Sequence, residues 1–143
     1  MAGPELLMAR FPAIPPSLKA SRNFIRSALV SLNLKDHETD IQLAIGEVMQ
    51  NIIRHGYGGG DSAGHITVKI HFNEEEGQFS CWIRDTAPPA HEGGWIIDRP
   101  RTPATPENGG IGLGLIHAIA ERYEITPGEA GNLFHLVFAF RAG

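Results

Sequence analysis

The sequence predicts an α+β fold, in which a layer of about three helices covers one face of a mixed, mostly antiparallel sheet. Two observations favour this fold. Apolar and polar residues alternate over residues 65–73, as in a half-buried strand, whereas apolar residues recur at helical spacing over residues 39–55. The expected elements follow in the order strand, two helices, two strands, helix and two strands. A length of 143 residues suits a single domain, residues 1–143.

Composition excludes several classes of protein. The formal net charge of −4 argues against duplex nucleic acid as a direct partner, because phosphate binding needs clustered Lys and Arg. No apolar run approaches membrane-spanning length, and the first residues, Met-Ala-Gly-Pro-Glu, lack the pattern of a signal peptide. The single cysteine, Cys81, excludes an internal disulfide and is expected in the core. A cytoplasmic, reducing location is the simplest expectation.

The N-terminal region predicts a strand followed by a helix. Residues 5–11 suit a strand, and the prolines within residues 12–16 are expected to end it. Ser17 is then expected to cap a helix that runs to about Leu32.

A second helix is expected to begin with a capping box. Thr39 is the expected cap residue, with Gln42 three residues later. The helix runs to about His55, where the glycines of residues 56–60 stop it. Its core-facing stripe consists of Ile41, Ile45, Val48 and Ile52.

The rest of the chain alternates between regular elements and one long irregular segment. Two strands are expected at residues 65–73 and 78–85, a helix at about 112–122, and strands at 123–126 and 132–140. Between them, residues 86–109 contain five prolines and no regular period. So long a structureless segment in a compact domain is usually a functional lid or disordered.

A polar stripe runs beside the apolar stripe of the second helix. Glu47, Asn51 and Arg54 follow one another at steps of four and three residues. A carboxylate there can accept a proton from a hydroxyl, an amide oxygen can bind Mg²⁺, and an arginine can contact phosphate. The alternative is a solvated helix face. His55 continues this stripe, either as a packed residue at the helix end or as a pocket wall.

Asp85 ends a strand whose other residues are largely apolar or aromatic. One interpretation is an aspartate that starts a turn. The other is a buried acceptor for the exocyclic amino group of adenine. A hydrogen bond to such a charged group contributes about 1.5–3 kcal/mol, so its loss would weaken nucleotide binding about 10–100-fold.

Glycines lead into the third helix. Gly109, Gly110, Gly112 and Gly114 precede or begin its apolar pattern, so backbone N–H groups at the helix start could face an anion. The alternative is a flexible loop end. The segment lacks the Lys-Ser/Thr pair of a Walker loop and does not follow a strand as a dinucleotide fingerprint must. The seven histidines form no metal-binding pattern.

These motifs resemble those of a known superfamily. Glu47-x-x-x-Asn51, then Asp85 before a proline-rich loop, then Gly110-Ile111-Gly112-Leu113-Gly114 are similar to the N box and the two glycine boxes of histidine-kinase-like ATPases, the superfamily of gyrase, Hsp90, histidine kinases and MutL. Within it, Glu47 to Tyr57 resembles the anti-sigma factor serine/threonine kinases, the family of RsbW and SpoIIAB. The resemblance implies a two-layer α/β sandwich of the Bergerat type.

The resemblance also implies roles for individual residues. Glu47 would be the catalytic base and Asn51 the Mg²⁺ ligand, while Asp85 would bind the adenine of ATP. The other nucleotide-binding positions would be Arg54, His55, Ala87, Gly110, Ile111, Gly112, Leu113 and Gly114. Ala87 stands where the family usually has glycine. Residues 86–109 would form the ATP lid, in which Arg99 or Arg101 either contacts the terminal phosphate or is solvated.

The expected function follows from the same resemblance. It is an ATP- and Mg²⁺-dependent serine/threonine protein kinase that phosphorylates a STAS-type anti-anti-sigma protein, sequesters a sigma factor or another effector, and forms a homodimer. The alternative is a non-catalytic binding module, in which ATP orders the lid and sets the affinity for a protein partner. A gyrase- or Hsp90-like hydrolase usually belongs to a much longer chain. A detached histidine kinase domain would need a phosphoacceptor histidine, a role for which His37 is poorly placed.

Overall fold

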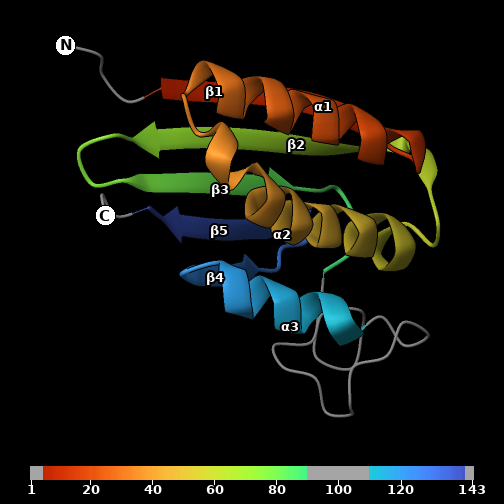
Figure 1. Cartoon of the computed structure of the whole chain (residues 1–143). Coiled ribbons are helices and arrows are strands. Elements are labelled where there is room, and N and C mark those ends of the chain that lie inside the picture. The colour runs from red at the N-terminus through yellow and green to blue at the C-terminus, as the bar shows by residue number, and fades with distance from the viewer. Residues whose placement is uncertain (1–4, 90–109, 141–143) are drawn as a thin grey trace.

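A computed structural model describes residues 5–89 and 110–140 of the chain. In these ranges, one five-stranded sheet forms one layer and the helices form a second layer on one of its faces (Figure 1). The strands are β1 (Glu5–Ala13), β2 (Asp61–Asn73), β3 (Gln78–Arg84), β4 (Arg122–Thr126) and β5 (Leu133–Ala139). The helices are α1 (Pro16–Ser31), α2 (Glu38–Asn51) and α3 (Gly110–Ile119), with short helices η1 (Lys35–His37) and η2 (Ile52–Gly56). The predicted α+β architecture is confirmed.

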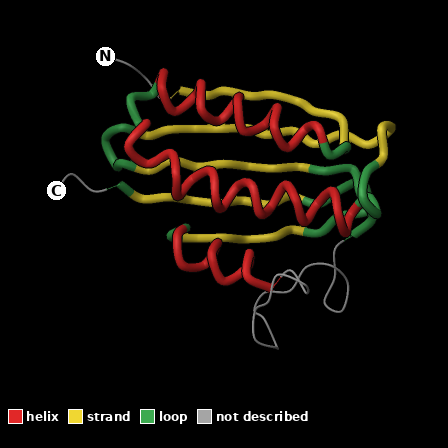
Figure 2. Tube along the Cα trace, turned by 45° about the vertical axis from the view of Figure 1, so that its right-hand side comes forward, coloured by secondary structure: helices red, strands yellow, loops and turns green. Residues whose placement is uncertain are grey.

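The strand order across the sheet is β1-β2-β3-β5-β4, and every pairing among the described strands is antiparallel. The sequence predicts a mixed sheet, and the mixed part of that prediction is wrong. Four residues join β2 to β3 and six join β4 to β5. Both connections are too short for the crossover that a parallel pair needs, so these neighbouring strands pair antiparallel. Figure 2 shows the helices in front of the strands.

The core lies between the sheet and the helices. Phe79, Cys81 and Ile83 alternate along β3 and are fully buried on its helix-facing side. Isoleucines of α2, including Ile41 and Ile45, pack onto this side and have almost no exposed surface. Burying each such side chain contributes about 1.5–3 kcal/mol. Cys81 is therefore core filler, as predicted, and burial raises the pKa of its thiol.

The first residues of α1 and α2 differ from those that the sequence predicts. Ser17 lies inside α1 and does not cap it, because Pro16 begins the helix, where a missing N–H is no loss. The Ser17 hydroxyl instead donates to the carbonyl of Pro12 at 2.6 Å. α2 begins at Glu38, before Thr39, and has no side-chain cap. The predicted capping box is therefore wrong.

β1 is longer than predicted. It continues through Pro12 to Ala13, and Pro12 lies opposite His65 of β2. A proline is tolerated there because β1 is an edge strand, with pairing on one side alone.

Candidate functional site

Four element ends meet at one end of the sheet. α2 ends, β3 ends, β5 begins and α3 begins on the same side of the molecule in both views (Figures 1 and 2). The register gives the strand part of this arrangement, since Arg84 of β3 lies opposite Leu133 of β5. α3 packs against α2 in the helical layer. Residues that follow or precede these ends are therefore brought together although they are far apart in the sequence.

Asp85 comes directly after β3 and continues its buried alternation. Since Phe79, Cys81 and Ile83 face the helices, Asp85 faces them too. Its side chain has no exposed surface. A fully buried carboxylate is costly unless hydrogen-bond donors satisfy it.

The donors come from two neighbouring segments. Oδ1 of Asp85 accepts hydrogen bonds from the backbone N–H of Asn132 at 2.8 Å, the backbone N–H of Ala87 at 3.1 Å and the Asn132 side-chain amide at 3.0 Å. Oδ2 accepts one long bond from the same amide, at 3.3 Å. Each carboxylate oxygen can accept about two hydrogen bonds, so Oδ2 retains acceptor capacity. This carboxylate suits a ligand that presents an amino group.

Burial raises the pKa of Asp85, and the hydrogen bonds from Asn132 and Ala87 and the charge of Arg84 oppose that rise. The bond from Ala87 closes a turn two residues after the aspartate, so Asp85 also starts a turn, as the simpler interpretation of the sequence holds. The turn uses Oδ1, so it does not compete with a ligand for Oδ2.

Asn132 and Gly131 are site residues that sequence reasoning missed. Asn132 is fully buried, and its amide also donates to the carbonyl of Pro88 at 3.0 Å. Gly131 has φ of +139°, and a Cβ there would overlap the carbonyl oxygen of Asp85. The sequence pattern places Asn132 at the start of the last strand. The local signal is a Gly-Asn pair at that point, to which sequence reasoning gave no role in the site.

On α2, Asn51 lies on the flank that is turned away from α1. Gln42 marks the α1 side, because its amide donates to the carbonyl of Arg22 at 2.9 Å. Asn51 is nine residues later, and at 3.6 residues per turn this is about half a turn around from Gln42. Asn51 is half-buried and Glu47, one turn earlier, is half-buried too. Glu47 also borders a groove of about 280 Å³ between α1 and α2.

The helical period predicted for Arg54 and His55 does not hold in the structure. α2 ends at Asn51, and η2 is a π-helix, whose wider turn breaks the steps of three and four residues. Arg54 and His55 are both exposed in this turn. Although His55 is largely exposed, the part of its side chain that is buried loses water, which lowers its pKa, and the charge of Arg54 lowers this pKa further. Wide helical turns are frequent at functional sites.

A second hydrogen-bond network ties this turn to the end of β3. The Tyr57 hydroxyl accepts from the backbone N–H of Thr86 at 2.6 Å and lies 2.7 Å from its Oγ1. The backbone N–H of His65 donates to the same Oγ1 at 3.1 Å. Gly64 is required beneath the Tyr57 ring, because a Cβ there would overlap the ring. The Tyr57 network fixes the residue that follows Asp85.

α3 begins at Gly110, two residues earlier than predicted, so its first turn contains Gly110 to Leu113. Gly114 is exposed, and an added Cβ would meet no atom within 4 Å. Packing within the described chain therefore does not require glycine at this position. The side chains of Ile111 and Leu113 lie outside the described structure, as do residues 90–109, which hold most of the predicted lid with Arg99 and Arg101.

In the described ranges, no three His, Cys, Asp or Glu side chains gather into a metal-binding group. Mg²⁺ needs few protein oxygens, because it keeps several of its waters. Asn51 can offer one amide oxygen. No described helix is long and apolar enough to cross a lipid bilayer.

The family profile described as "Histidine kinase-like ATPase domain" matches residues 11–138. The chain belongs to this family. This match confirms the superfamily, and with it the fold, that the sequence motifs imply. No curated protein matches it.

Solved structures give the same fold. The RsbU and RsbW domains of Rv1364c from Mycobacterium tuberculosis align with a TM-score of 0.68 at 21% identity, over 94% of this chain and 32% of that one. The histidine kinase domain of the blue-light activated kinase from Erythrobacter litoralis aligns with a TM-score of 0.54 at 16% identity, over 85% and 60%. The catalytic domain of histidine kinase ThkA gives 0.52 at 15% identity, over 93% and 96%. This histidine kinase-like ATPase domain thus spans about a third of the first of these chains.

Proposed function

We propose that this domain is an ATP-dependent protein kinase that transfers phosphate to a serine or threonine of a small STAS-type regulator. The observation that carries the proposal is the Asp85 carboxylate, which is buried, held by Asn132 and left with acceptor capacity on Oδ2. It faces the helical layer at the end of the sheet where α2 ends and α3 begins. Membership of an ATPase family supports adenine as the group that donates to it.

The remaining roles are assigned by the motifs. Asn51 would hold Mg²⁺, which when bound neutralises charge on the phosphates. Backbone N–H groups at the start of α3 would bind the phosphates, since the four first N–H groups of a helix have no partner within it. Glu47 would accept the proton of the substrate hydroxyl while the hydroxyl oxygen forms a bond to the terminal phosphorus of ATP and ADP leaves. General-base help of this kind contributes about 10²–10⁴-fold to the rate.

The proposed partners are a STAS-type anti-anti-sigma protein and a sigma factor or another effector that the domain sequesters. The likeness in fold to the structure of the RsbU and RsbW domains of Rv1364c supports this setting. A cytoplasmic homodimer is part of the proposal, and sedimentation measurements of the purified chain test its oligomeric state.

Incubation with labelled ATP and Mg²⁺, beside STAS-type proteins from the same genome, tests the proposal. Label on a serine or threonine of one partner is the expected result. A Glu47→Gln variant should bind ATP normally and transfer phosphate at least about 100-fold more slowly. Glu74→Gln, in the exposed turn after β2, is the matched control and should transfer at the wild-type rate.

Three outcomes would contradict the proposal in different ways. ATP binding without label on any partner would favour a nucleotide-dependent binding module. Wild-type transfer by Glu47→Gln would reject this residue as the base while leaving the kinase intact. No heat of ATP binding in calorimetry would reject the site itself.

A further inference from the structure

The face of the sheet opposite the helices is uncovered in the described structure (Figures 1 and 2). The strand register maps this open face in rows that cross all five strands. The middle row consists of Met8, Lys69, Trp82, His135 and Glu124. A second row on the same face consists of Arg10, Thr67, Arg84, Leu133 and Thr126.

Charge on this open face has the opposite sign to the net charge of the chain. A third row, on the other side of the middle row, contains Arg122. The three rows together hold one carboxylate, Glu124, and four cations, Arg10, Lys69, Arg84 and Arg122. Arg122 and Glu124 lie 3.9 Å apart and partly offset each other. Arg10, Lys69 and Arg84 are exposed, and within residues 5–89 and 110–140 none of them forms an ion pair. The formal net charge of the whole chain is −4.

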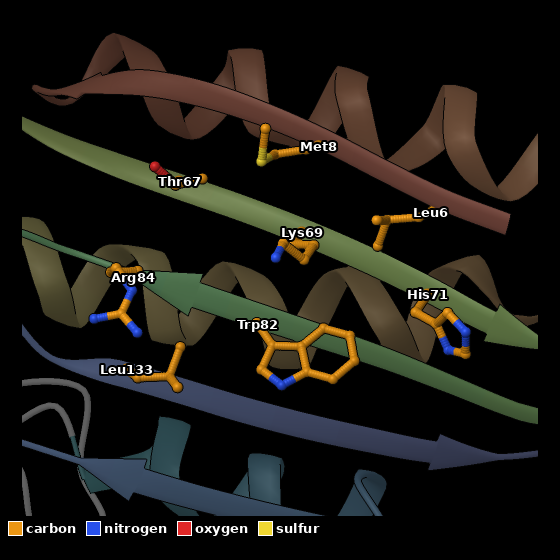
Figure 3. Close-up of a pocket in the computed structure, with 8 residues that line it drawn as sticks. All are labelled: Leu6, Met8, Thr67, Lys69, His71, Trp82, Arg84 and Leu133. Atoms are coloured by element: carbon orange, nitrogen blue, oxygen red, sulfur yellow. The ribbon is translucent and has the colours of Figure 1, made fainter. Parts of the chain in front are cut away.

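Apolar side chains lie among these cations. Leu6 and Met8 are 59% and 65% exposed, the highest values among the large apolar residues described. With Trp82 and Leu133 they border a hollow of about 420 Å³, into which Lys69 and Arg84 also project (Figure 3). Contiguous exposed apolar surface that is rimmed by polar groups is typical of interaction sites.

Aromatic rings pack against one another at the centre of the open face. The Trp82 ring stacks on His135 with centroids 4.6 Å apart and an interplanar angle of 7°, and His71 meets its edge at 6.4 Å. A tryptophan held in place in this way is a preformed anchor, and such residues dominate binding energy at protein interfaces.

A second copy of the chain is a poor occupant of this open face. A two-fold axis beside Trp82 would set Arg84 against Arg84 if it ran along the strands, and Lys69 against Lys69 if it ran across them. Like charges held opposite each other across an interface disfavour that partner.

We propose that the open face binds an acidic, amphipathic segment of a partner protein. Its apolar side chains fill the hollow beside Met8 and Trp82, and its carboxylates pair with Lys69 and Arg84. A protein segment fits better than a lipid surface, because the face is hollowed at its centre and its most exposed apolar side chains lie at one edge. The proposal does not depend on phosphate transfer or on ATP.

Nuclear magnetic resonance titrations without nucleotide test this proposal. The probe is a synthetic peptide with Leu and Glu at helical spacing, and the control peptide has Lys in place of each Glu. The acidic peptide should shift the amide signals of Lys69, Trp82 and Arg84, and added salt should weaken binding. The basic peptide should leave these signals unchanged.

Matched variants separate charge from apolar contact. The double variant Lys69→Glu and Arg84→Glu should bind the acidic peptide at least tenfold more weakly than the wild type. The control, Lys19→Glu with Arg22→Glu, makes an equal charge change at exposed positions of α1 and should bind the peptide like the wild type. Leu6→Ser with Met8→Ser should also weaken binding of the acidic peptide. Val30→Ser with Leu43→Ser, at exposed apolar positions of the helices, should leave that binding unchanged.

Several results would overturn the proposal. One is equal binding of the two peptides, or shifts confined to the helices. Another is a dimer in sedimentation that the Lys69→Glu and Arg84→Glu changes dissociate, which would assign the open face to a second copy. Binding to phosphatidylserine vesicles without binding to the peptide would assign it to a membrane. ATP binding measured on the same variants keeps the outcome separate from that of the proposed kinase.

Discussion

The side-chain amide of Asn132 donates hydrogen bonds to both carboxylate oxygens of Asp85, at 3.0 Å and 3.3 Å. This pair joins the end of β3 to the residue before β5, and the backbone repeats the link, because the N–H of Asp85 donates to the carbonyl of Asn132 at 3.0 Å. With the backbone N–H groups of Asn132 and Ala87, which also donate to Oδ1, the chain itself fixes the position of the carboxylate. Such preorganisation reduces the cost of ordering a binding site.

The raised pKa of Asp85 predicts a definite dependence of stability on pH. Because burial raises the pKa in the folded state, the native protein keeps this proton to a higher pH than the unfolded chain does. The resulting stabilisation is complete below the ordinary pKa of 3.8 and is lost as pH rises through the folded pKa. Asp85→Asn has no proton to lose at this position. As pH rises from 3.8 through the folded pKa of Asp85, the free energy of unfolding of this variant should therefore fall less than that of the wild type.

Urea unfolding at a series of pH values measures this difference. Asp36→Asn, at an exposed position, is the control and should follow the wild-type curve. Parallel curves for Asp85→Asn and the wild type would contradict the prediction.

Gly131→Ala should be strongly destabilising. The φ of +139° disfavours any side chain, and the new Cβ would overlap the carbonyl oxygen of Asp85. Gly58→Ala separates the two causes, because Gly58 also has a positive φ, of +59°, but an open surrounding. We expect a loss of about 1–2 kcal/mol for Gly58→Ala and a larger one for Gly131→Ala, measured by chemical denaturation. Equal losses would mean that the close approach to Asp85 has no energetic weight.

Tyr57 and Thr86 should be energetically coupled. Tyr57→Phe removes the hydroxyl that accepts from the Thr86 N–H, and Thr86→Val removes the hydroxyl that lies 2.7 Å from it. Each change should cost about 0.5–1.5 kcal/mol, the net contribution of a hydrogen bond whose partner water can reach after the change. The double variant should lose less than the sum of the two single losses. Additive losses would show that the two hydroxyls act independently.

Gly114→Ala should separate stability from nucleotide binding. The described structure has room for the methyl group, and alanine in a helix stabilises by about 0.5–1 kcal/mol over glycine. If phosphates lie against the start of α3, the same methyl should reduce ATP affinity at least tenfold in calorimetry. Gly46→Ala, at an equally open position of α2, should gain stability without losing affinity. Unchanged affinity in both variants would remove Gly114 from the proposed site.

The sequence predicted those features that depend on local spacing. The alternation in β2 and β3 and the apolar stripe of α2 predict the two layers. The alternation in β3 also predicts that Asp85, directly after this strand, is buried. Asn132 was missed because its partner lies 47 residues earlier, and no local period encodes which strands become neighbours. The register of β3 with β5 supplies that information.

Helix ends were predicted less well than helix interiors. The capping role expected of Ser17 and Thr39 fails because Pro16 and Glu38 begin their helices earlier, so that other residues occupy the cap positions. The π-helical turn after Asn51 also has no local signal, because an apolar pair such as Ile52 and Ile53 fits an α-helix equally well. The positions of Glu47, Asn51 and Arg54 around a ligand therefore stay a prediction.

The strand order has a consequence for how the domain opens. β3 and β5 each have a neighbour on both sides, whereas β1 and β4 form the two margins of the sheet. Fraying starts where strands lack a second neighbour, so the amide hydrogens of β1 and β4 should exchange first and those of β3 and β5, which adjoin Asp85 and Asn132, last. Thermal fluctuation at the periphery is thereby kept away from the buried carboxylate.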